Sequence, residues 1–350
     1  MKRYFKYYLP LLIIIFITVS GCGKDKDEEQ STADVYAAGF EGQFAKYWKN
    51  GKPVILGKST MHSDVYGITV VGNDVHVVGC EMNIRGNYVA MYWKNGVAVN
   101  LTEGYTSAFA TGIVLKGSDV YISGQEATSS RSYIAKYWKN GVPVNLTGEK
   151  YNSITTGITV AGSFVCTVGQ HRSLDFSTTI PCYWMNGQLN DLSDRNVSTA
   201  DQMITSSGND VYVAWSGIYN SLGQFRTNYK KNFAAPVVIN DGTADARGSD
   251  IAVSGNDVYI AGVGPGTNSN VVAAKYWKNG TVVNLTNGPQ NAFANSIAIA
   301  GNDVYVGGCV NVNNAQNSNT VAVYWKNGTE VRLTNGQQTA VIRKIVVIQK

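Results

Sequence analysis

The 350-residue sequence is poor in charged residues, proline, histidine and cysteine. Only 15% of its residues are Asp, Glu, Lys or Arg, which argues against a disordered chain or a coiled coil. The formal net charge is +5, and three of the positive residues lie within the first six, so the rest of the chain carries 5 − 3 = +2. So weak a positive charge excludes the electrostatic footprint of a nucleic-acid-binding protein, and we expect no nucleic-acid partner.

Long hydrophobic runs are also missing, apart from the eleven residues Leu9–Val19. This run is too short to span a bilayer, and it follows Lys2, Arg3 and Lys6, as the apolar core of a signal peptide would. The run leads into Ser20-Gly21-Cys22, which resembles the bacterial lipobox. The resemblance implies a lipoprotein signal peptide over residues 1–21, and Cys22 as a lipidated first residue that anchors the protein to a membrane.

Residues 22–33 contain an acidic run and no apolar periodicity, so we expect a flexible tether behind the lipidated Cys22. An acidic run in this place resembles the surface-export signal of Bacteroidota-type lipoproteins, and a plain spacer is the alternative. The expected location is therefore the outer membrane, with the protein facing either the periplasm or the cell surface.

A repeat of 45 to 48 residues fills the remainder of the chain. The motif Tyr-Trp-Lys-Asn-Gly occurs unaltered five times, and altered copies begin at Tyr183 and Tyr229. A second motif, Gly-Asn-Asp-Val-Tyr, runs in step with it. Asn-Gly between apolar runs is a strong hairpin signal, and each repeat divides into four strands of five to six residues. The sequence thus predicts an all-β, seven-bladed β-propeller over residues 34–350 with four antiparallel strands per blade.

The closure of the ring is also predicted, because the first repeat lacks its first strand. The missing strand is found in residues 345–348, so the C-terminal strand completes the N-terminal blade. The Trp-x-Asn-Gly rhythm resembles extracellular-repeat propellers of uncharacterised bacterial lipoproteins, which carry no known catalytic residues to transfer. We expect the repeated Tyr, Trp, Lys and Asp to be structural, with the Asp accepting hydrogen bonds from turn amides.

Candidate functional residues are those that break the repeat on the face with the longer loops. Just past the end of the expected second strands, or near that point, lie the ligand-binding candidates Glu41, Glu81, Arg85, Glu126, Arg131, His171, Arg172, Trp215 and Tyr219. The loops that lead into each blade add His62, Asp64, Tyr66, Tyr105, Phe109, Tyr151, Asp201, Asp245, Arg247 and Phe293. Carboxylates, guanidinium groups and aromatic faces suit a carbohydrate or a peptide.

These features predict a monomeric, non-catalytic envelope protein that binds a glycan or protein ligand. One alternative is a polysaccharide hydrolase or lyase that uses loop carboxylates such as Glu81 and Glu126, and another is a scaffold lipoprotein in an outer-membrane complex. No nucleotide-binding motif, catalytic elbow or metal-ligand cluster occurs in the sequence, so we expect no catalytic residues, no cofactor and no metal.

Apart from Cys22, the sequence has four cysteines. Cys166 and Cys182 lie in adjacent expected strands of the fourth blade, where either a disulfide or two buried thiols is consistent with the pattern. Cys80 and Cys309 occupy equivalent positions in blades two and seven, and we expect no bond between them.

Overall fold

A computed structural model of the protein describes residues 33–57, 61–149, 152–172, 179–192, 199–219, 223–232, 234–239, 245–266, 271–313 and 319–350. Ala33–Lys350 form one compact unit. The expected signal peptide, the lipidation site Cys22, nearly all of the tether and the loop residue Tyr151 lie outside the described residues.

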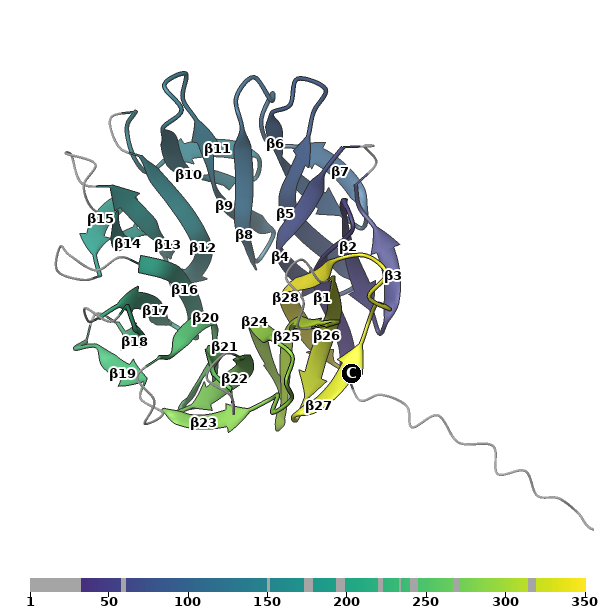
Figure 1. The fold of residues 1–350 in the computed structure, drawn as a ribbon. Helices are drawn as coiled ribbons and strands as arrows, with labels where there is room; N and C mark the ends of the chain where they lie inside the picture. Colours follow the sequence, from purple (N-terminus) through teal and green to yellow (C-terminus); the bar gives the residue numbers. More distant parts are fainter. Residues whose placement is uncertain are drawn as a thin grey trace, which may run out of the picture. The chain divides into compact units, whose positions relative to one another are not determined.

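The described residues form 28 β-strands in seven four-stranded antiparallel sheets, arranged as blades around a central axis (Figure 1). The innermost strands of blades one to seven are β28 (Ala340–Gln349), β4 (Ser63–Val71), β8 (Ala108–Lys116), β12 (Ser153–Ala161), β16 (Thr199–Ser207), β20 (Arg247–Ser254) and β24 (Ala292–Ala300). The second strands are β1 (Ala33–Glu41), β5 (Asp74–Met82), β9 (Asp119–Ala127), β13 (Phe164–Arg172), β17 (Asp210–Ile218), β21 (Asp257–Pro265) and β25 (Asp303–Asn311).

The third and outermost strands are shorter than the first two. The third strands are β2 (Phe44–Lys49), β6 (Tyr88–Lys94), β10 (Tyr133–Lys139), β14 (Thr179–Met185), β18 (Phe225–Lys231), β22 (Val272–Lys278) and β26 (Thr320–Lys326). The outermost strands are β3 (Lys52–Ile55), β7 (Val97–Asn100), β11 (Val142–Asn145), β15 (Gln188–Asp191), β19 (Val237–Ile239), β23 (Thr281–Asn284) and β27 (Thr329–Arg332). The predicted seven-bladed propeller is confirmed.

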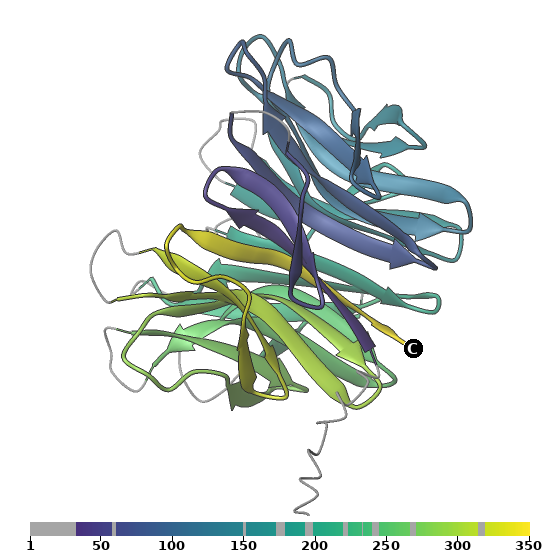
Figure 2. The same ribbon diagram turned by 90° about the vertical axis from the view of Figure 1, so that its right-hand side faces the viewer.

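Ring closure follows the predicted scheme. The last strand, β28, pairs antiparallel with β1 along its whole length, from Ala33 opposite Gln349 to Glu41 opposite Ala340 (Figure 2). The closing strand begins five residues earlier than predicted, because the ladder continues past Ile345 to Ala340. The innermost and second strands are eight to ten residues long, so the expected length of five to six was too short for them.

Each blade contains one buried tryptophan. In six blades it belongs to the third strand, and in blade five it is Trp215 of the second strand β17. In blade three, the ring of the third-strand Trp138 lies against Gly124 of the second strand. The tryptophans therefore fill equivalent places between blades, as predicted for the repeated ones.

The hairpins on the opposite face from the long loops share one polar arrangement. In blade two, the Asn95 side chain accepts a hydrogen bond from the Val75 amide and donates one to Asp74, and Lys94 pairs with the same carboxylate. The expectation that the Asp accepts turn amides was wrong, because Asn95 fills that role. Asn95 also takes a left-handed backbone conformation (φ 50°), as the Asn-Gly turn requires.

Blade four replaces this ion pair as a unit. Phe164 stands in place of the aspartate and Met185 in place of the lysine, while Asn186 still accepts the Val165 amide. Because both charged residues are absent from blade four, no carboxylate or ammonium group is left there without its partner.

The cysteines Cys166 and Cys182 are free thiols, so the disulfide alternative is wrong. The register places Cys166 opposite Met185 and Cys182 opposite Gly169, three positions apart along the ladder. At about 3.3 Å per residue this offset exceeds the Cα separation that a disulfide spans. Burial raises the pKa of the Cys166 thiol to about 11. Cys80 and Cys309 are free as well.

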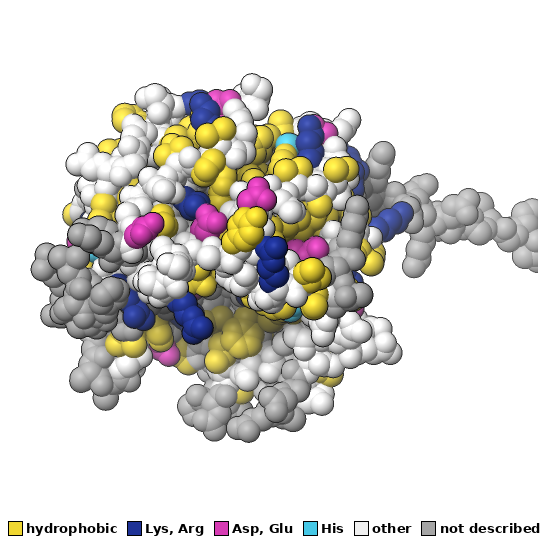
Figure 3. Space-filling model, turned by 90° about the horizontal axis from the view of Figure 1, so that it is seen from above, with side chains coloured by type: hydrophobic (Ala, Val, Ile, Leu, Met, Phe, Trp, Pro, Cys, Tyr) yellow, Lys and Arg dark blue, Asp and Glu magenta, His cyan; other side chains and the backbone are white. Residues whose placement is uncertain are grey.

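The outer rim carries exposed aliphatic side chains on the outermost strands, including Ile55, Val97 and Val142. On the side of the ring in Figure 3, apolar side chains lie between neighbouring basic and acidic ones. The described residues contain no helix with the length and hydropathy needed to cross a membrane.

Candidate ligand-binding cavity

Every innermost strand contains a β-bulge at the same height. The pairing with the second strand skips one residue in six blades, and the skipped residues are Tyr66, Thr111, Thr156, Ser249, Asn295 and Arg343. In blade five the irregularity spans two residues between Thr199 and Gln202, one of which is Asp201. A bulged residue takes no part in the regular ladder, so its side chain can be aimed away from the sheet.

A glycine opposite each bulge explains its position in six blades. A Cβ atom on Gly79 of β5 would lie 2.0 Å from the backbone oxygen of Asp64, and Gly124 of β9 stands equally close to the oxygen of Phe109. Only glycine allows the innermost strand to approach this closely. Blade five has Trp215 at this position, and there the irregularity is the larger one.

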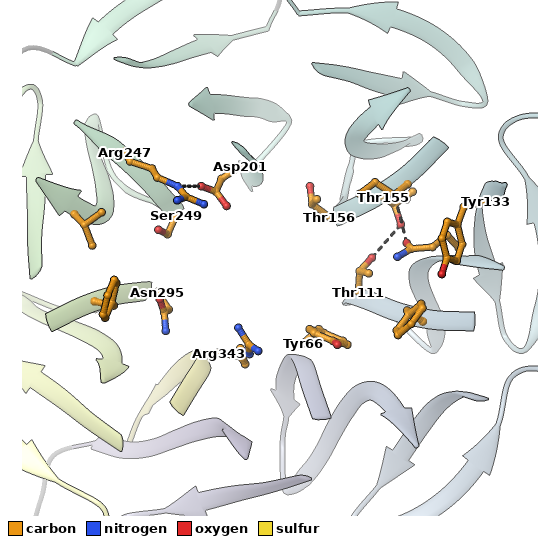
Figure 4. A pocket seen from close by; sticks show the side chains of 15 residues that line it. Tyr66, Thr111, Tyr133, Thr155, Thr156, Asp201, Arg247, Ser249, Asn295 and Arg343 are labelled. Atoms are coloured by element: carbon orange, nitrogen blue, oxygen red, sulfur yellow. Dashed lines mark hydrogen bonds and ion pairs between the residues drawn. The ribbon is translucent and has the colours of Figure 1, made fainter. Parts of the chain in front are cut away.

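The seven bulges surround a central cavity of about 700 Å³ (Figure 4). Most of its wall comes from the first half of the innermost strands, next to the long loops that enter each blade, and Gln125, Tyr133 and Val263 are contributed by second and third strands. The lining residues are Tyr66, Phe109, Thr111, Gln125, Tyr133, Ile154, Thr155, Thr156, Asp201, Arg247, Ser249, Val263, Phe293, Asn295 and Arg343. A second cavity of about 150 Å³ lies along the same strands and shares six of the bulge residues.

One side of the cavity is aromatic. Tyr66, Phe109 and Tyr133 come from blades two and three, and the rings of Phe109 and Tyr133 are 6.2 Å apart. Behind them, Tyr88 packs on Phe109 at 5.1 Å and meets His62 edge-on at 6.0 Å. This chain of rings fixes the orientation of the aromatic wall.

Next to the aromatic wall lies a group of hydroxyl side chains. The Thr111 hydroxyl is 3.0 Å from that of Thr155 and 3.1 Å from that of Ser123. Thr156 donates to the backbone oxygen of Gln202 at 2.7 Å and so connects blades four and five. These hydroxyl groups present both donors and acceptors to the cavity.

Arg343 reaches the cavity from the closing strand β28. Its Nη2 atom donates to Asp64 at 3.0 Å, and its guanidinium lies 5.4 Å from the Phe40 ring and 6.0 Å from the Tyr66 ring. Burial raises the pKa of Asp64, while the positive charge of Arg343 acts in the opposite direction. Asp64 also accepts the Val65 amide at 2.8 Å, so the carboxylate and the arginine hold each other in place.

A second ion pair lies elsewhere on the wall. The Nε atom of Arg247 donates to Asp201 at 2.6 Å, and its guanidinium is 5.4 Å from the Phe225 ring. In Figure 4 this pair lies beside Ser249, and the Arg343 guanidinium points toward the middle of the cavity between Asn295 and Tyr66.

A third ion pair lines the second cavity. Lys344 donates to both oxygens of Asp250 at 2.7 Å, and Ser296 donates to the same carboxylate at 2.6 Å. The Ile345 amide in turn donates to Ser296 at 3.1 Å. The closing strand of blade one is thus tied through blade seven to blade six.

The nine ligand-binding candidates lie outside the cavity wall. Most of the second-strand candidates belong to β-strands rather than loops, because the second strands are longer than expected; they are Glu41, Glu81, Glu126, His171, Arg172 and Trp215. Glu41 pairs with Lys46, Glu126 with Lys136, and His171 with Asp191. Trp215 belongs to strand β17 and is buried between blades four and five, so its expected place in a loop is wrong.

The remaining candidates lie in or beside loops. Arg85 packs over the Tyr105 ring at 5.1 Å, and Tyr219 lies under Arg226 at 4.1 Å. Arg131 takes a left-handed backbone conformation in the turn before β10. These contacts stabilise individual loops and gather no common site.

The loops that lead into the blades were the better guide to the cavity. Five of their ten residues line it, namely Tyr66, Phe109, Asp201, Arg247 and Phe293. Sequence reasoning missed Arg343 because the closing strand was expected to begin at Ile345. The signal was two adjacent charges, Arg343 and Lys344, between the buried residues Ile342 and Ile345.

No protein-family model and no curated protein matches the chain. Among solved structures, an acylaminoacyl peptidase in complex with Z-Gly-Gly-Phe-chloromethyl ketone is similar at TM-score 0.50 and 10% identity, covering 88% of this chain and 51% of that one. The polysaccharide lyase Uly1 is similar at TM-score 0.49 and 11% identity, covering 88% of this chain and 85% of that one. The β-propeller domain of the Trilobed protease from Pyrococcus furiosus is similar at TM-score 0.45 and 10% identity, covering 87% of this chain and 99% of that one.

Identities this low reflect the propeller fold alone. The chain spans about half the length of the acylaminoacyl peptidase.

Proposed function

We propose that this protein is a non-catalytic, lipid-anchored binding protein of the outer membrane that holds a glycan in its central cavity. The observation that carries this proposal is the composition of the cavity wall. Tyr66, Phe109 and Tyr133 offer aromatic faces on which the C–H surfaces of sugar rings pack. The neighbouring Thr, Ser, Asn and Gln side chains match the hydroxyl groups of a sugar.

The size of the cavity favours a short stretch of glycan over a folded protein. Its volume of about 700 Å³ lies within the range of about 300–1,000 Å³ that is common for small-molecule sites. The hydrolase alternative relied on Glu81 and Glu126, and neither lines the cavity. Glu126 is moreover paired with Lys136, which favours a binding role over acid–base chemistry at that position.

The binding role is tested with the full-length chain, purified in detergent, on a panel of immobilised polysaccharides. The variant Asn295→Trp fills the cavity from a bulge position, and Thr329→Trp on the exposed outer strand β27 is its control. We expect the wild type and Thr329→Trp to bind at least one polysaccharide, Asn295→Trp to bind none, and the bound polysaccharide to keep its length. Absence of any glycan binding, or shortening of the polysaccharide, would contradict the proposal.

The anchor is tested separately, in cells that produce the Cys22→Ala variant. We expect this variant in the soluble fraction and the wild type in the membrane fraction, because only Cys22 can carry the proposed lipid. Digestion of the wild type by protease added to intact cells would place it on the surface, which the acidic tether favours. Retention of the Cys22→Ala variant in membranes would overturn the anchor.

A further inference from the structure

Three ion pairs along the central axis share an asymmetry, in that the cation is always more exposed than the anion. The side chain of Arg343 is 41% exposed and that of Asp64 is 5% exposed. For Lys344 and Asp250 the values are 34% and 8%. The carboxylates are thus withdrawn into the wall, and the positive groups face the space where a ligand would lie.

The Arg247–Asp201 pair shows the same order with a smaller difference, because the side chain of Arg247 is 45% exposed and that of Asp201 is 31% exposed. Arg247 uses its Nε atom for Asp201, and among the described residues its two terminal nitrogens have no hydrogen-bond partner. Arg343 likewise donates through Nη2 alone, counted over the part of the chain that the structure describes. Both guanidinium groups therefore keep donors available, in a planar geometry that matches a carboxylate.

Both arginines are also held in position before any ligand arrives. Arg343 is fixed by Asp64 and lies over the rings of Phe40 and Tyr66, and Arg247 lies over Phe225. Such preorganisation lowers the entropic cost of ligand binding. The paired carboxylates orient the guanidinium groups, while the greater exposure of the cations leaves them the first charges that a ligand meets.

We propose that the glycan held in the cavity is acidic, and that Arg343 and Arg247 bind the carboxylate groups of its uronic acid units. This inference rests on the proposed function and specifies its ligand. The two arginines lie in different blades, with Ser249 and Asn295 on the wall between them and the aromatic wall beside Arg343 (Figure 4). In this arrangement a uronic acid unit places its carboxylate on Arg343 and its ring against Tyr66.

The experiment measures binding of the full-length protein in detergent to uronate polysaccharides, to the same polysaccharides after reduction of their carboxyl groups, to neutral polysaccharides, to dextran sulfate and to polyglutamate. We expect binding to at least one uronate polysaccharide, and loss of at least about tenfold in affinity after carboxyl reduction. The affinity should also fall as salt is raised, because charge attraction is screened.

Arg247→Gln and Arg343→Gln should each weaken uronate binding by about tenfold or more. Arg332→Gln, which alters an exposed arginine on β27, is the matched control and should bind as the wild type does. Because Arg343→Gln leaves the buried Asp64 without its cation, the double variant Asp64→Asn/Arg343→Gln is included to keep the fold. It should retain the weak binding of the single variant.

The outcomes separate the inference from the proposed function. Binding to neutral polysaccharides alone, unchanged in Arg247→Gln and in the double variant, would overturn the acidic ligand and leave glycan binding standing. Preference for dextran sulfate or polyglutamate over every uronate polysaccharide would also overturn it. Failure to bind any polysaccharide would overturn the proposed function itself.

Discussion

In blade five the buried tryptophan is Trp215 of the second strand, and it lies beside Lys230 of the third strand. Trp215 stands in the second strand where six blades have glycine, and Lys230 stands in the third strand where they have tryptophan. The Lys230 ammonium lies 5.6 Å from the Trp215 ring. Blade five thus fills the common place between blades from the neighbouring strand.

Trp215→Ala should therefore act on stability. We expect it to lower the free energy of unfolding by about 3–5 kcal/mol, because it empties a buried site. Trp277→Ala in blade six should have an effect of the same size, since Trp277 fills the equivalent place. Denaturant unfolding of both variants measures this. A Trp215→Ala variant of normal stability and reduced glycan binding would instead make Trp215 a ligand contact.

Gly124→Ala should destabilise the propeller by about 2–3 kcal/mol, because the added methyl group would collide with the Phe109 oxygen and the Trp138 ring. Gly148→Ala is the control, since nothing lies within 4 Å of its Cβ position. Thermal and denaturant unfolding of the two variants should differ clearly. Equal stability would show that the bulge can shift without cost.

Ser296→Ala should weaken ring closure. The change removes the donor to Asp250 and the acceptor for the buried Ile345 amide, so we expect a loss of about 1–3 kcal/mol. Ser118→Ala, in an exposed turn, should leave the free energy of unfolding unchanged. Hydrogen exchange gives a second measurement, in which β28 amides should exchange faster in Ser296→Ala only. Unchanged protection of β28 would argue against a role of Ser296 in closure.

His76 should make stability depend on pH. Burial lowers the pKa of His76, the charge of Lys94 acts in the same direction, and Asp74 opposes both. An unfolded chain binds the proton near its ordinary pKa of about 6.5, so stability present above that pH is lost as the pH falls toward the lower folded pKa. His76→Tyr restores the residue found in most other blades. The urea midpoint should fall less between pH 7 and pH 5.5 in this variant than in the wild type, because the contribution of His76 is absent. An equal decrease of the urea midpoint in both proteins would assign the pH dependence to other groups.

The repeat made the fold predictable, because period, Asn-Gly turns and the divided first blade are all local signals. The strand lengths were harder to predict from the sequence, since charged residues such as Glu81 and Glu126 are typical of loops. Their place in the strands depends on pairing with residues of the adjacent strands. The cavity depends on register. Tyr66 and Arg343 face it because a bulge skips them, and that bulge requires the glycine opposite, which is distant in the sequence.

The disulfide alternative failed for a related reason. Cys166 and Cys182 lie in adjacent strands, yet the ladder sets them three positions apart. Adjacency was visible in the repeat, whereas the pairing of individual residues was not.

The bulges allow the residues that face the cavity to differ between blades without interrupting the sheet ladders. The ladder closes around each skipped residue, so a Tyr, Thr, Ser, Asn or Arg is accommodated at the same height in different blades. Substitutions at these positions can change what the cavity recognises while the sheets stay paired. Seven such positions around one axis form a set from which new specificities can evolve, or be engineered, one blade at a time.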